Sequence, residues 1–512
     1  MPEVDAANAG PSAVDEVVTC FLRHRGEVLL VRRSGRVGTY RGRWGAVSGF
    51  AEGDPLEAAW REIAEETGLQ GAVTLVKRGE PFAFDDPDEG RRWRVHPFLF
   101  DASSRDARLD WEAEEGVWVA PPEILLRSTV PRLWTSYERA GPTVADLRAD
   151  REHGSAWLSL RAVEVLRDRA AALAAGGAEG GGPEGARTGG EDADGSLARA
   201  EVTRLARALA GARPAMIALP NRVHRAMARA LGGAASGGAA TAVRDAAGTV
   251  LREAIAAEGA VAEAVARAAA GRTVMTLSLS GTVQDGLLSA DPAPALVVVC
   301  ESRPGAEGRT LAARLVEAGV NAVLVPDAAV AWALGAEGVD LLLVGADTVY
   351  EDGSVVNKVG TRPAALAARA AGVRVLAAAS TDKIAATGAA WTGEDEEGDA
   401  READASGTDP WGTDASEADA SGARGSGALG SGARGSGARG SGAAARTRAP
   451  GAPRALRRRA PLFEWTPGEL IDAVLTERGE LTPERVAAVA AEHAADRAWL
   501  RRTDPGSDPD GP

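Results

Sequence analysis

Five short apolar runs alternate with helical segments between residues 272 and 392, and this alternation constrains the fold of the chain more than any other feature. The runs are 272–277, 295–300, 321–325, 340–344 and 373–378. Apolar runs of roughly four to eight residues between helical segments are typical of a parallel sheet with crossover helices. We therefore predict a Rossmann-like lobe over 272–392 and 461–500, which includes a helix over 467–477.

Two stretches with almost no apolar residues divide the chain. Residues 176–195 are rich in glycine and acidic residues and predict a flexible linker. Residues 393–453 combine an acidic run with repeats of Gly-Ser-Gly-Ala-Arg and predict a disordered insertion. Arginine-glycine repeats can bind RNA, but a plain flexible insertion is the favoured interpretation. A linker such as 176–195 favours independent movement of the parts on either side of it.

The segment 14–150 predicts a mixed α/β unit. Strands are expected at 17–23, 27–32, 73–77, 93–100 and 116–119. A helix is expected from Asp54 to Thr67, because Asp54 suits an N-cap, Pro55 suits the first helical position and Gly68 suits the stop. Helical patterns follow, as an extension over 151–175 and an alanine-rich subdomain over 196–271.

Charge and composition exclude some classes of partner. The formal net charge is −15, which argues against nonspecific binding of the whole surface to nucleic acid or to an anionic membrane. No run of about 18 apolar residues is present, so no membrane span is expected. Cys20 and Cys300 both lie in apolar, strand-like runs, which fits buried thiols in a reducing compartment. The chain begins without the features of a signal peptide, and a cytoplasmic location is expected.

Three glutamates on one turn of the predicted helix carry the strongest chemical signal. Glu62, Glu65 and Glu66 stand at i, i+3 and i+4, so their carboxylates project from one helical face. Like charges at this spacing repel, and a hard divalent cation such as Mg²⁺ or Mn²⁺ removes that repulsion. Arg61 can reach Glu65 at i+4 and orient it. The alternative is an ordinary solvated acidic face.

The residues around these glutamates resemble the signature of the Nudix family. Residues 61–69, Arg-Glu-Ile-Ala-Glu-Glu-Thr-Gly-Leu, match its second half, and Ser48-Gly49 looks like its glycine-rich entry. The interval from Gly49 to Arg61 is two residues short of the family spacing, so the upstream glutamate has no counterpart in register. Glu52 or Asp54 would have to take its place.

The Nudix resemblance implies an α/β/α sandwich that hydrolyses a nucleoside diphosphate linked to another group. It implies Mg²⁺ (or Mn²⁺) held by Glu62, Glu65 and Glu66, with Arg61 as a further catalytic residue. The general base stays open among these glutamates and the carboxylates at 112, 114 and 115. Trp93 and His96 could contact a base, although an aromatic residue on a strand is usually core. An inactive Nudix fold in a regulatory protein is an alternative.

The second half of the chain resembles the family of the α, β and δ subunits of translation initiation factor 2B and the ribose-1,5-bisphosphate and methylthioribose-1-phosphate isomerases. The similarity covers about 196–392 and 461–480. The matching motifs, in chain order, are Ala212-Arg213-Pro214, Glu301-Ser302-Arg303-Pro304-Gly305, Glu307-Gly308-Arg309, Val344-Gly345-Ala346-Asp347, Asn357-Lys358-Val359-Gly360-Thr361 and Ser380-Thr381-Asp382-Lys383.

This second resemblance implies a site for a phosphorylated sugar or nucleotide and a homodimer or higher homo-oligomer. Several of these residues follow apolar strands, and ligands bind at the carboxyl ends of parallel strands. The candidate ligand-binding residues are Arg213, Ser278, Arg303, Arg309, Asp347, Asn357, Lys358 and Lys383. In the isomerases a cysteine and an aspartate act together; Asp347 matches the aspartate, but Ser278 stands in the cysteine's position. A hydroxyl is a poor proton shuttle near neutrality, so isomerisation is the less favoured alternative to a binding or regulatory role.

Overall fold

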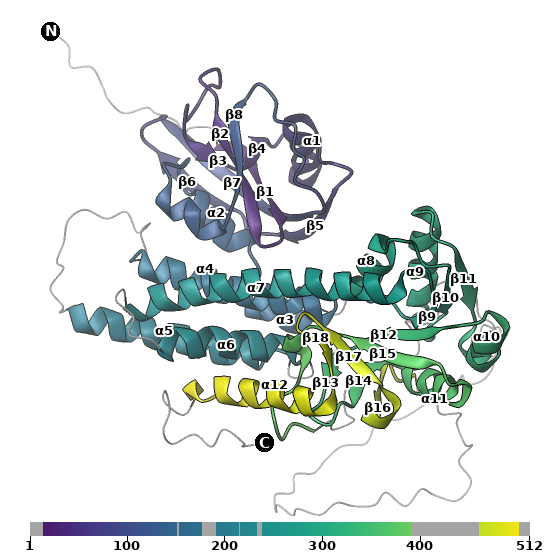
Figure 1. The fold of residues 1–512 in the computed structure, drawn as a ribbon. Helices are drawn as coiled ribbons and strands as arrows, with labels where there is room; N and C mark the ends of the chain where they lie inside the picture. Colours follow the sequence, from purple (N-terminus) through teal and green to yellow (C-terminus); the bar gives the residue numbers. More distant parts are fainter. Residues whose placement is uncertain are drawn as a thin grey trace, which may run out of the picture.

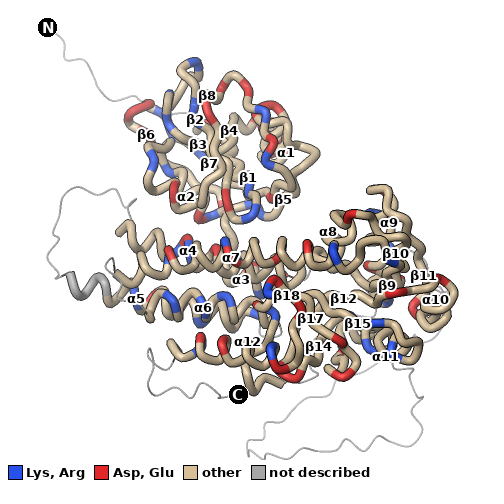
Figure 2. The backbone as a smooth tube through the Cα atoms, in the orientation of Figure 1, with Lys and Arg blue, Asp and Glu red and all other residues tan. Residues whose placement is uncertain are grey.

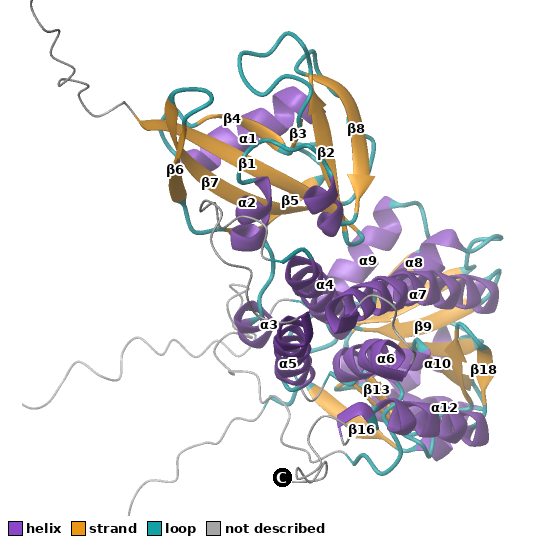
Figure 3. Cartoon of the chain, turned by 90° about the vertical axis from the view of Figure 1, so that its left-hand side faces the viewer, coloured by secondary structure: helices purple, strands orange, loops and turns teal. Residues whose placement is uncertain are grey.

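The computed structural model describes residues 14–150, 153–176, 191–213, 216–232, 238–390 and 460–500. The N-terminal module stands apart at one end, and a second module of long helices and a parallel sheet forms the rest (Figures 1 and 3). The predicted disordered insertion at 393–453 and most of the predicted linker lie outside the described residues.

The N-terminal module is built on an eight-stranded mixed sheet. The path β3-β2-β1-β7-β5 is extended by β4 on β1, β6 on β7 and β8 on β2. The strands are β1 (Val14–His24), β2 (Glu27–Arg33), β3 (Trp44–Gly45), β4 (Val47–Phe50), β5 (Val73–Arg78), β6 (Phe82–Asp86), β7 (Arg91–Ala102) and β8 (Ala113–Val119). All five strands predicted here are confirmed, and β3, β4 and β6 were not predicted.

Helices cover both faces of this sheet, as predicted for an α/β/α sandwich. Ile63 of α1 (Pro55–Thr67) packs with Val18 and Phe100 on one face. Leu133 of α2 (Leu133–Ala140) packs with Phe21 on the other. The short elements η1 (Pro121–Leu126) and α3 (Val144–Ala149) follow β8 and α2.

The predicted ends of α1 are confirmed. Asp54 caps the helix by accepting a hydrogen bond from the Leu56 backbone N–H at 3.2 Å, and Pro55 occupies the first turn. Gly68 closes it in the left-handed region at φ 66°.

Four helices form the first part of the second module: α4 (Ser155–Ala174), α5 (Glu191–Ala210), α6 (Ala218–Gly232) and α7 (Gly238–Ala269). Leu166 of α4, Val223 of α6 and Val250 of α7 share one hydrophobic core. The predicted extension at 151–175 therefore packs in the same core as the predicted helical subdomain. The domain boundaries themselves stay a prediction.

A seven-stranded sheet forms the lobe beyond these helices, in the order β11-β10-β9-β12-β15-β17-β18. Every neighbouring pair is parallel except β17 with β18. The strands are β9 (Thr273–Leu277), β10 (Leu296–Cys300), β11 (Ala322–Val325), β12 (Leu341–Gly345), β15 (Arg374–Ala378), β17 (Ala473–Thr476) and β18 (Gly479–Leu481). The five predicted strands are confirmed. After β9, the strands β10 and β11 are added on one side of it. The later strands β12 and β15 are added on its other side, so the strand order reverses between β9 and β12.

Both faces of this sheet are covered, as predicted for a Rossmann-like lobe. Apolar residues of α7, α8 (Gly281–Ser289) and α9 (Glu307–Glu317) pack on one face. Those of α10 (Val330–Ala336), α11 (Thr361–Ala371) and α12 (Pro483–Asp496) pack on the other. The short helices η2 (Asp327–Ala329) and η3 (Thr381–Lys383) lie in the loops after β11 and β15.

A small three-stranded sheet adds a wall beside the lobe. Its order is β13 (Thr348–Val349), β14 (Val355–Lys358) and β16 (Phe463–Thr466). The helix predicted over 467–477 is wrong. The short turn η5 (Gly468–Leu470) and strand β17 occupy it instead, because β17 is buried beside β15 and sheet pairing overrides the local helical pattern.

Helix α4 joins the two modules through a cluster of buried charged residues, here called the α4 charge cluster. Its members are Arg23, Asp101, Arg161, Glu164, Arg167 and Asp168. Arg23 of β1 lies 3.4 Å from Glu164 of α4 and 2.7 Å from Asp101 of β7. Tyr137 of α2 donates a hydrogen bond to Asp168 of α4 at 2.8 Å.

The expected independence of the two modules is therefore wrong. The predicted linker follows α4, whereas the contacts between the modules are made by α4 itself. Trp157 of α4 donates to Asp101 at 3.0 Å, and Ala172 of α4 is part of the core beside α2. A flexible segment beyond this helix cannot separate the N-terminal module from it.

Two expectations from composition have structural counterparts. Cys20 and Cys300 are both buried free thiols. Within the described ranges, no helix combines the length and apolar character that crossing a membrane requires.

Candidate functional sites

The α1 acidic cluster is the first candidate site. It consists of Glu62, Glu65 and Glu66 on α1 with Asp110 and Glu112 before β8. Glu66 is buried with 7% of its surface exposed, and it accepts a hydrogen bond from the Ser48 backbone N–H at 3.1 Å. The carboxylate of Glu62 fills the space beside Gly49, where a Cβ atom would lie 2.2 Å from Glu62 Cδ. A side chain at position 49 would collide with this carboxylate, so the close approach of β4 to Glu62 requires glycine there. Figure 2 shows acidic residues on α1.

Electrostatics in this cluster are one-sided. The pKa of Glu66 is raised to about 8, mainly by burial, with the charges of Glu112, Glu62 and Asp110 acting in the same direction and the hydrogen bond from Ser48 opposing them. Burial also raises the pKa of Glu112, with Asp110, Glu62 and Glu65 acting in the same direction and Arg33 opposing them. The cluster therefore gathers carboxyl groups that raise one another's pKa, with Arg61 beside Glu62 and Arg33 near Glu112 as counter-charges.

Arg61 pairs differently from the prediction. Its guanidinium donates to the neighbouring Glu62 at 3.0 Å and to the Phe50 carbonyl at 3.1 Å, not to Glu65. The carbonyl at the end of β4 draws the side chain toward Glu62. Arg61 thus fixes Glu62 beside the loop that follows β4.

The missing upstream glutamate has no clear replacement. Asp54 uses its carboxylate to cap α1, and Glu52 is exposed in the loop before the helix. Among the three candidate bases Glu112, Glu114 and Glu115, it is Glu112 whose pKa is raised by Glu62 and Glu65 of α1. Glu114 instead accepts a hydrogen bond from the Gly35 backbone N–H at 3.1 Å. Trp93 is core, at 5% exposure, and His96 lies 3.1 Å from Glu16.

The α1 acidic cluster has the donor chemistry that a hard divalent cation requires. Carboxylate oxygens are the ligands that Mg²⁺ and Mn²⁺ prefer, and a cation would relieve the repulsion around the buried Glu66. In the part of the chain that the structure describes, no three Asp, Glu, His or Cys side chains already surround a common point. Binding would therefore require the glutamate side chains to rotate toward one another on α1.

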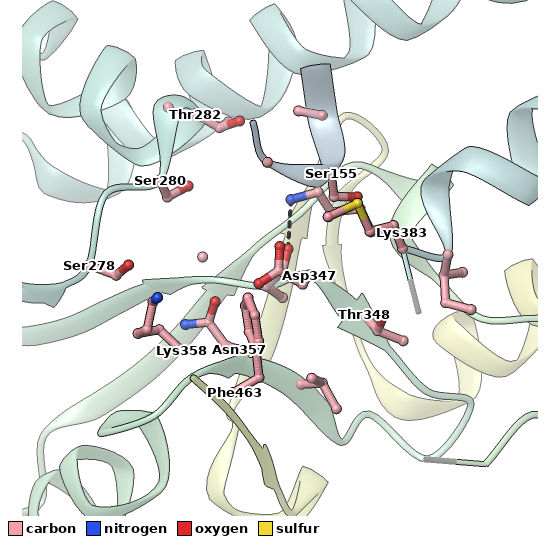
Figure 4. Close-up of a pocket in the computed structure, with 18 of the residues that line it drawn as sticks. Ser155, Ser278, Ser280, Thr282, Asp347, Thr348, Asn357, Lys358, Lys383 and Phe463 are labelled. Carbon is pink, nitrogen blue, oxygen red and sulfur yellow. Dashed lines mark hydrogen bonds between the residues drawn. The ribbon is translucent and has the colours of Figure 1, made fainter. Parts of the chain in front are cut away.

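The second candidate site is a cavity of about 790 Å³ in the second module. It lies where the strand order reverses, between the carboxyl ends of β9 and β12. Ligands of open parallel sheets bind at this position because the loops diverge there. Ser278 and Ser280 follow β9, and Asp347 follows β12 (Figure 4).

Six of the eight predicted ligand-binding residues line this cavity. They are Arg213, Ser278, Asp347, Asn357, Lys358 and Lys383. Lys358 on β14 lies 2.5 Å from Glu307, and Lys383 donates to the Ala346 carbonyl at 2.7 Å. Asn357 donates to Thr361 at 3.0 Å. Ser278 has a left-handed backbone, φ 64°, and its N–H donates to Ser302 at 2.6 Å.

Arg303 and Arg309 do not line the cavity. Both follow β10, one strand away from the point of reversal. Arg309 is exposed and forms an ion pair with Glu301, so its charge is directed away from the cavity. The backbone N–H of Arg303 donates to Asp327 at 2.7 Å. The motif around β10 instead contributes Glu307, which holds Lys358.

Sequence reasoning missed several lining residues. Ser280 caps α8, whose first turn, with Gly281 and Thr282, faces the cavity. The sequence Ser-Gly-Thr after a strand was the available signal. Phe463 on β16 is placed by pairing with β14, which no local pattern indicates. Arg25 comes from the turn between β1 and β2 in the N-terminal module.

Known proteins similar to this chain fall into the two predicted groups. The NUDIX domain model matches residues 14–140, and the Initiation factor 2 subunit family model matches residues 151–483. The chain is 35% identical over 198 residues to a ribose 1,5-bisphosphate isomerase of Haloferax volcanii, which is 38% of this chain and 59% of that protein. It is 43% identical over 74 residues to a methylthioribose-1-phosphate isomerase of Desulforudis audaxviator, 14% of this chain and 21% of that protein.

Solved structures that resemble this chain in part include a translation initiation factor eIF-2B of Pyrococcus horikoshii OT3. Its TM-score is 0.44 at 21% identity, with 67% of this chain and 96% of that chain covered. A 5-methylthioribose 1-phosphate isomerase of the same organism gives a TM-score of 0.44 at 16% identity, with 75% of this chain and 90% of that chain covered.

The curated relatives match over only part of their length. This chain spans 59%, 27% and 52% of three ribose 1,5-bisphosphate isomerases. The family model for the second module nevertheless covers more than half of the chain, 151–483 of 512 residues. The chain therefore belongs to the Initiation factor 2 subunit family and carries a NUDIX domain fused before the family's own module.

Proposed function

We propose that the NUDIX domain is a Mg²⁺-dependent hydrolase of a nucleoside diphosphate derivative and that the second module binds a phosphorylated sugar or nucleotide. The α1 acidic cluster carries the first part of this proposal. A buried glutamate whose charged neighbours are mostly acidic is unfavourable in the free protein. Such an arrangement suits a site that becomes neutralised when a cation binds.

The roles of individual residues follow from their contacts. Glu62, Glu65 and Glu66 would hold Mg²⁺ (or Mn²⁺), which when bound polarises phosphate oxygens and offsets their charge. Arg61 holds Glu62 in place through the Phe50 carbonyl, and the Ser48 N–H orients Glu66. Glu112 is the carboxylate best placed to take the proton of the attacking water, since it interacts with both Glu62 and Glu65.

The experiment for the hydrolase compares two proteins on one panel. Wild type and the Glu65→Gln/Glu66→Gln variant are incubated with nucleoside diphosphate sugars and related anhydrides, with Mg²⁺ or with EDTA, and product release is measured. Turnover that needs Mg²⁺ and is lost in the variant supports the proposal. If the wild type turns over nothing on the panel, the NUDIX fold is inactive, and the regulatory alternative replaces the hydrolase.

The cavity of the second module supports binding of a phosphate group. Gly281 and Thr282 in the first turn of α8 line the cavity, and helix N-termini attract anions. Lys358 on β14 and Lys383 on η3 add positive charge. Phosphates are usually bound by such a combination of backbone donors and a few cations.

Sugar-phosphate isomerisation is the second candidate function. Ser278 and Asp347, the positions that match the catalytic pair of the isomerases, both line the cavity. The similar proteins of Haloferax volcanii and Desulforudis audaxviator are themselves named as isomerases. Formation of ribulose 1,5-bisphosphate from ribose 1,5-bisphosphate, abolished by Asp347→Asn, would establish this activity. Binding without turnover would leave a sensor or regulatory role.

Three further properties belong to the same proposal. The protein acts in the cytoplasm, and the second module associates as a homodimer or higher homo-oligomer. The buried free cysteines support the location, and the family resemblance supports the association. RNA binding by the arginine-glycine repeats at 393–453 stays the less favoured possibility.

A further inference from the structure

The cavity of the second module receives one side chain from the NUDIX domain. Arg25 lines this cavity together with Ile255 and Glu258 of α7 and Asp285 of α8. It is the only residue among the described positions 14–150 that does so. The residue lies in the two-residue turn between β1 and β2, far in sequence from the rest of the cavity.

The turn itself is an unusual place for an arginine. His24 pairs with Glu27, and the two residues between them both have positive φ, 48° at Arg25 and 83° at Gly26. A turn of this kind favours Asn or Asp followed by Gly, because a longer side chain is disfavoured in the left-handed region. Gly26 satisfies the rule and Arg25 does not. Residues held in disfavoured backbone conformations occur preferentially at functional positions.

Contacts with the helices fix the position of this turn. Arg167 of α4 donates to the Gly26 carbonyl at 3.2 Å. A Cβ atom on Gly26 would lie 2.8 Å from both Glu164 of α4 and Leu251 of α7, so the backbone is pressed between these two helices. Arg23, two residues before Arg25, belongs to the α4 charge cluster and is held in the same interface by Glu164. The turn is therefore held at the cavity rim by the docking of the whole domain.

The guanidinium of Arg25 has donors to offer a ligand. Among the described residues, none forms an ion pair with it within 4.0 Å, whereas Lys358 is held by Glu307 and Lys383 by the Ala346 carbonyl. Asp285 is near enough for Arg25 to lower its pKa, against the effect of burial, which raises it. The positive charge of Arg25 thus acts on the α8 wall of the cavity, beside the helix N-terminus.

We propose that Arg25 is a ligand-recognition residue of the second module, supplied by the NUDIX domain, and that it contacts an anionic group of the phosphorylated ligand. This inference rests on the proposed function of the cavity. It makes the site a composite of two domains, so tight binding requires the NUDIX domain to be docked on α4 and α7. Arginine suits this role because its planar donors match two phosphate oxygens at once.

The test uses the full chain and titration calorimetry with ribose 1,5-bisphosphate at low salt. Arg25→Asn removes the charge and places a favoured residue in the turn, so it tests recognition without weakening the hairpin. Arg25→Lys keeps the charge. Arg36→Asn is the matched control, because Arg36 is an exposed arginine of the same domain that does not line the cavity. Urea unfolding of each variant confirms that the domain stays folded.

We expect Arg25→Asn to bind about tenfold more weakly than wild type, the range for a charge-assisted hydrogen bond. Arg25→Lys should recover part of the affinity, and Arg36→Asn should bind as wild type does. Equal affinities of Arg25→Asn and Arg36→Asn would overturn the inference and leave the proposed function intact. A wild-type chain that binds none of ribose 1,5-bisphosphate, ribose 5-phosphate and AMP would overturn both.

Discussion

Two groups of charged residues in this protein, each with a buried member at its centre, have opposite composition. In the α4 charge cluster, three arginines alternate with three carboxylates, and Arg23, Arg161 and Glu164 are almost entirely inaccessible. In the α1 acidic cluster, the buried Glu66 faces further carboxylates. The first group is neutral and lies between two domains, and the second is strongly negative and lies beside a loop.

The difference separates a structural role from a functional one. Balanced buried charges satisfy one another and fix how two surfaces fit together, although they contribute little net stability. Buried like charges destabilise the protein unless something else enters the site. The composition of a buried cluster is thus a better guide to its role than its burial, and each of the following experiments tests that rule.

The largest effect is expected for Glu112→Gln. Removing a general base usually slows an enzyme by about 10²–10⁴-fold, and we expect kcat to fall about a thousandfold. Steady-state hydrolysis at saturating Mg²⁺ measures it, and calorimetric titration with Mg²⁺ should show little change in metal affinity. Glu115→Gln, on the exposed part of β8, is the control and should keep wild-type kcat. A similar loss in both variants would remove Glu112 from the mechanism.

The same chemical change should have opposite consequences for stability in the two clusters. Glu164→Gln leaves Arg23 and Arg161 without one counter-charge, and we expect a loss of about 3 kcal/mol in the free energy of unfolding. Asp101 still compensates Arg23, which keeps the loss at the lower end of the range for broken buried pairs. Above pH 8, where Glu66 is ionised, Glu66→Gln removes a like charge and keeps an acceptor for the Ser48 N–H, so without Mg²⁺ its free energy of unfolding should be no lower than that of the wild type. Urea titrations measure the free energy of unfolding of both variants. Equal losses would show that the two clusters do not differ in their contribution to stability.

A third buried titratable group, His224, tests the same relation between burial and charge, because no carboxylate partner among the described residues offsets its burial. His224 on α6 accepts a hydrogen bond at Nδ1 from Trp499, and burial lowers its pKa to about 4, with Arg497 and His493 adding to the effect. Because the unfolded chain titrates near pH 6.5, stability from this group is present above that pH and is lost as the pH falls through 4.

The measurement compares wild type with His224→Gln, which cannot titrate. The difference in unfolding free energy between them should shrink by about 2 to 3 kcal/mol between pH 7 and pH 4.5. Other titrating groups are common to both proteins and cancel in the difference. A difference that stays constant over this range would show that His224 keeps a normal pKa.

The smallest effect concerns Mg²⁺ itself. A ligand present at ten times its Kd stabilises the folded state by about 1.4 kcal/mol. Unfolding of the wild type should shift by this amount when MgCl₂ is added and return when EDTA is added. The Glu65→Gln/Glu66→Gln variant should not respond. A response of the same size in that variant would place the cation elsewhere on the protein.

The sequence predicts the regular parts of this fold well. Every strand expected in the sheets at 14–119 and 272–378 is present, since each combines an apolar run with clear flanking turns. The short strands β13, β14 and β16 were not foreseen: β13 and β14 form a short local pair, and β16 joins β14 from about a hundred residues further along the chain. The helix expected at 467–477 fails for the same reason: its local pattern is overruled by burial beside β15.

The candidate sites divide in a similar way. The three glutamates stand on consecutive turns of α1, as helical periodicity predicts, but among the described residues their carboxylates do not surround a common point. Arg303 and Arg309 have the expected chemistry but follow a strand away from the reversal of the sheet. Arg25 could not be predicted, because nothing in the hairpin indicates which surface it docks against. Long-range docking, not residue type, limited the prediction.

The late position of β16 and β17 has a consequence for synthesis of the protein. All strands of the NUDIX domain lie within residues 14–119, whereas the sheet of the second module and the cavity wall need residues 463–481. At ~5–20 residues per second, the ribosome completes the first domain some tens of seconds before the second. During that interval the nascent chain presents a finished NUDIX sandwich followed by a sheet without its last strands, so chaperones that cover exposed strand edges have their target in the second module.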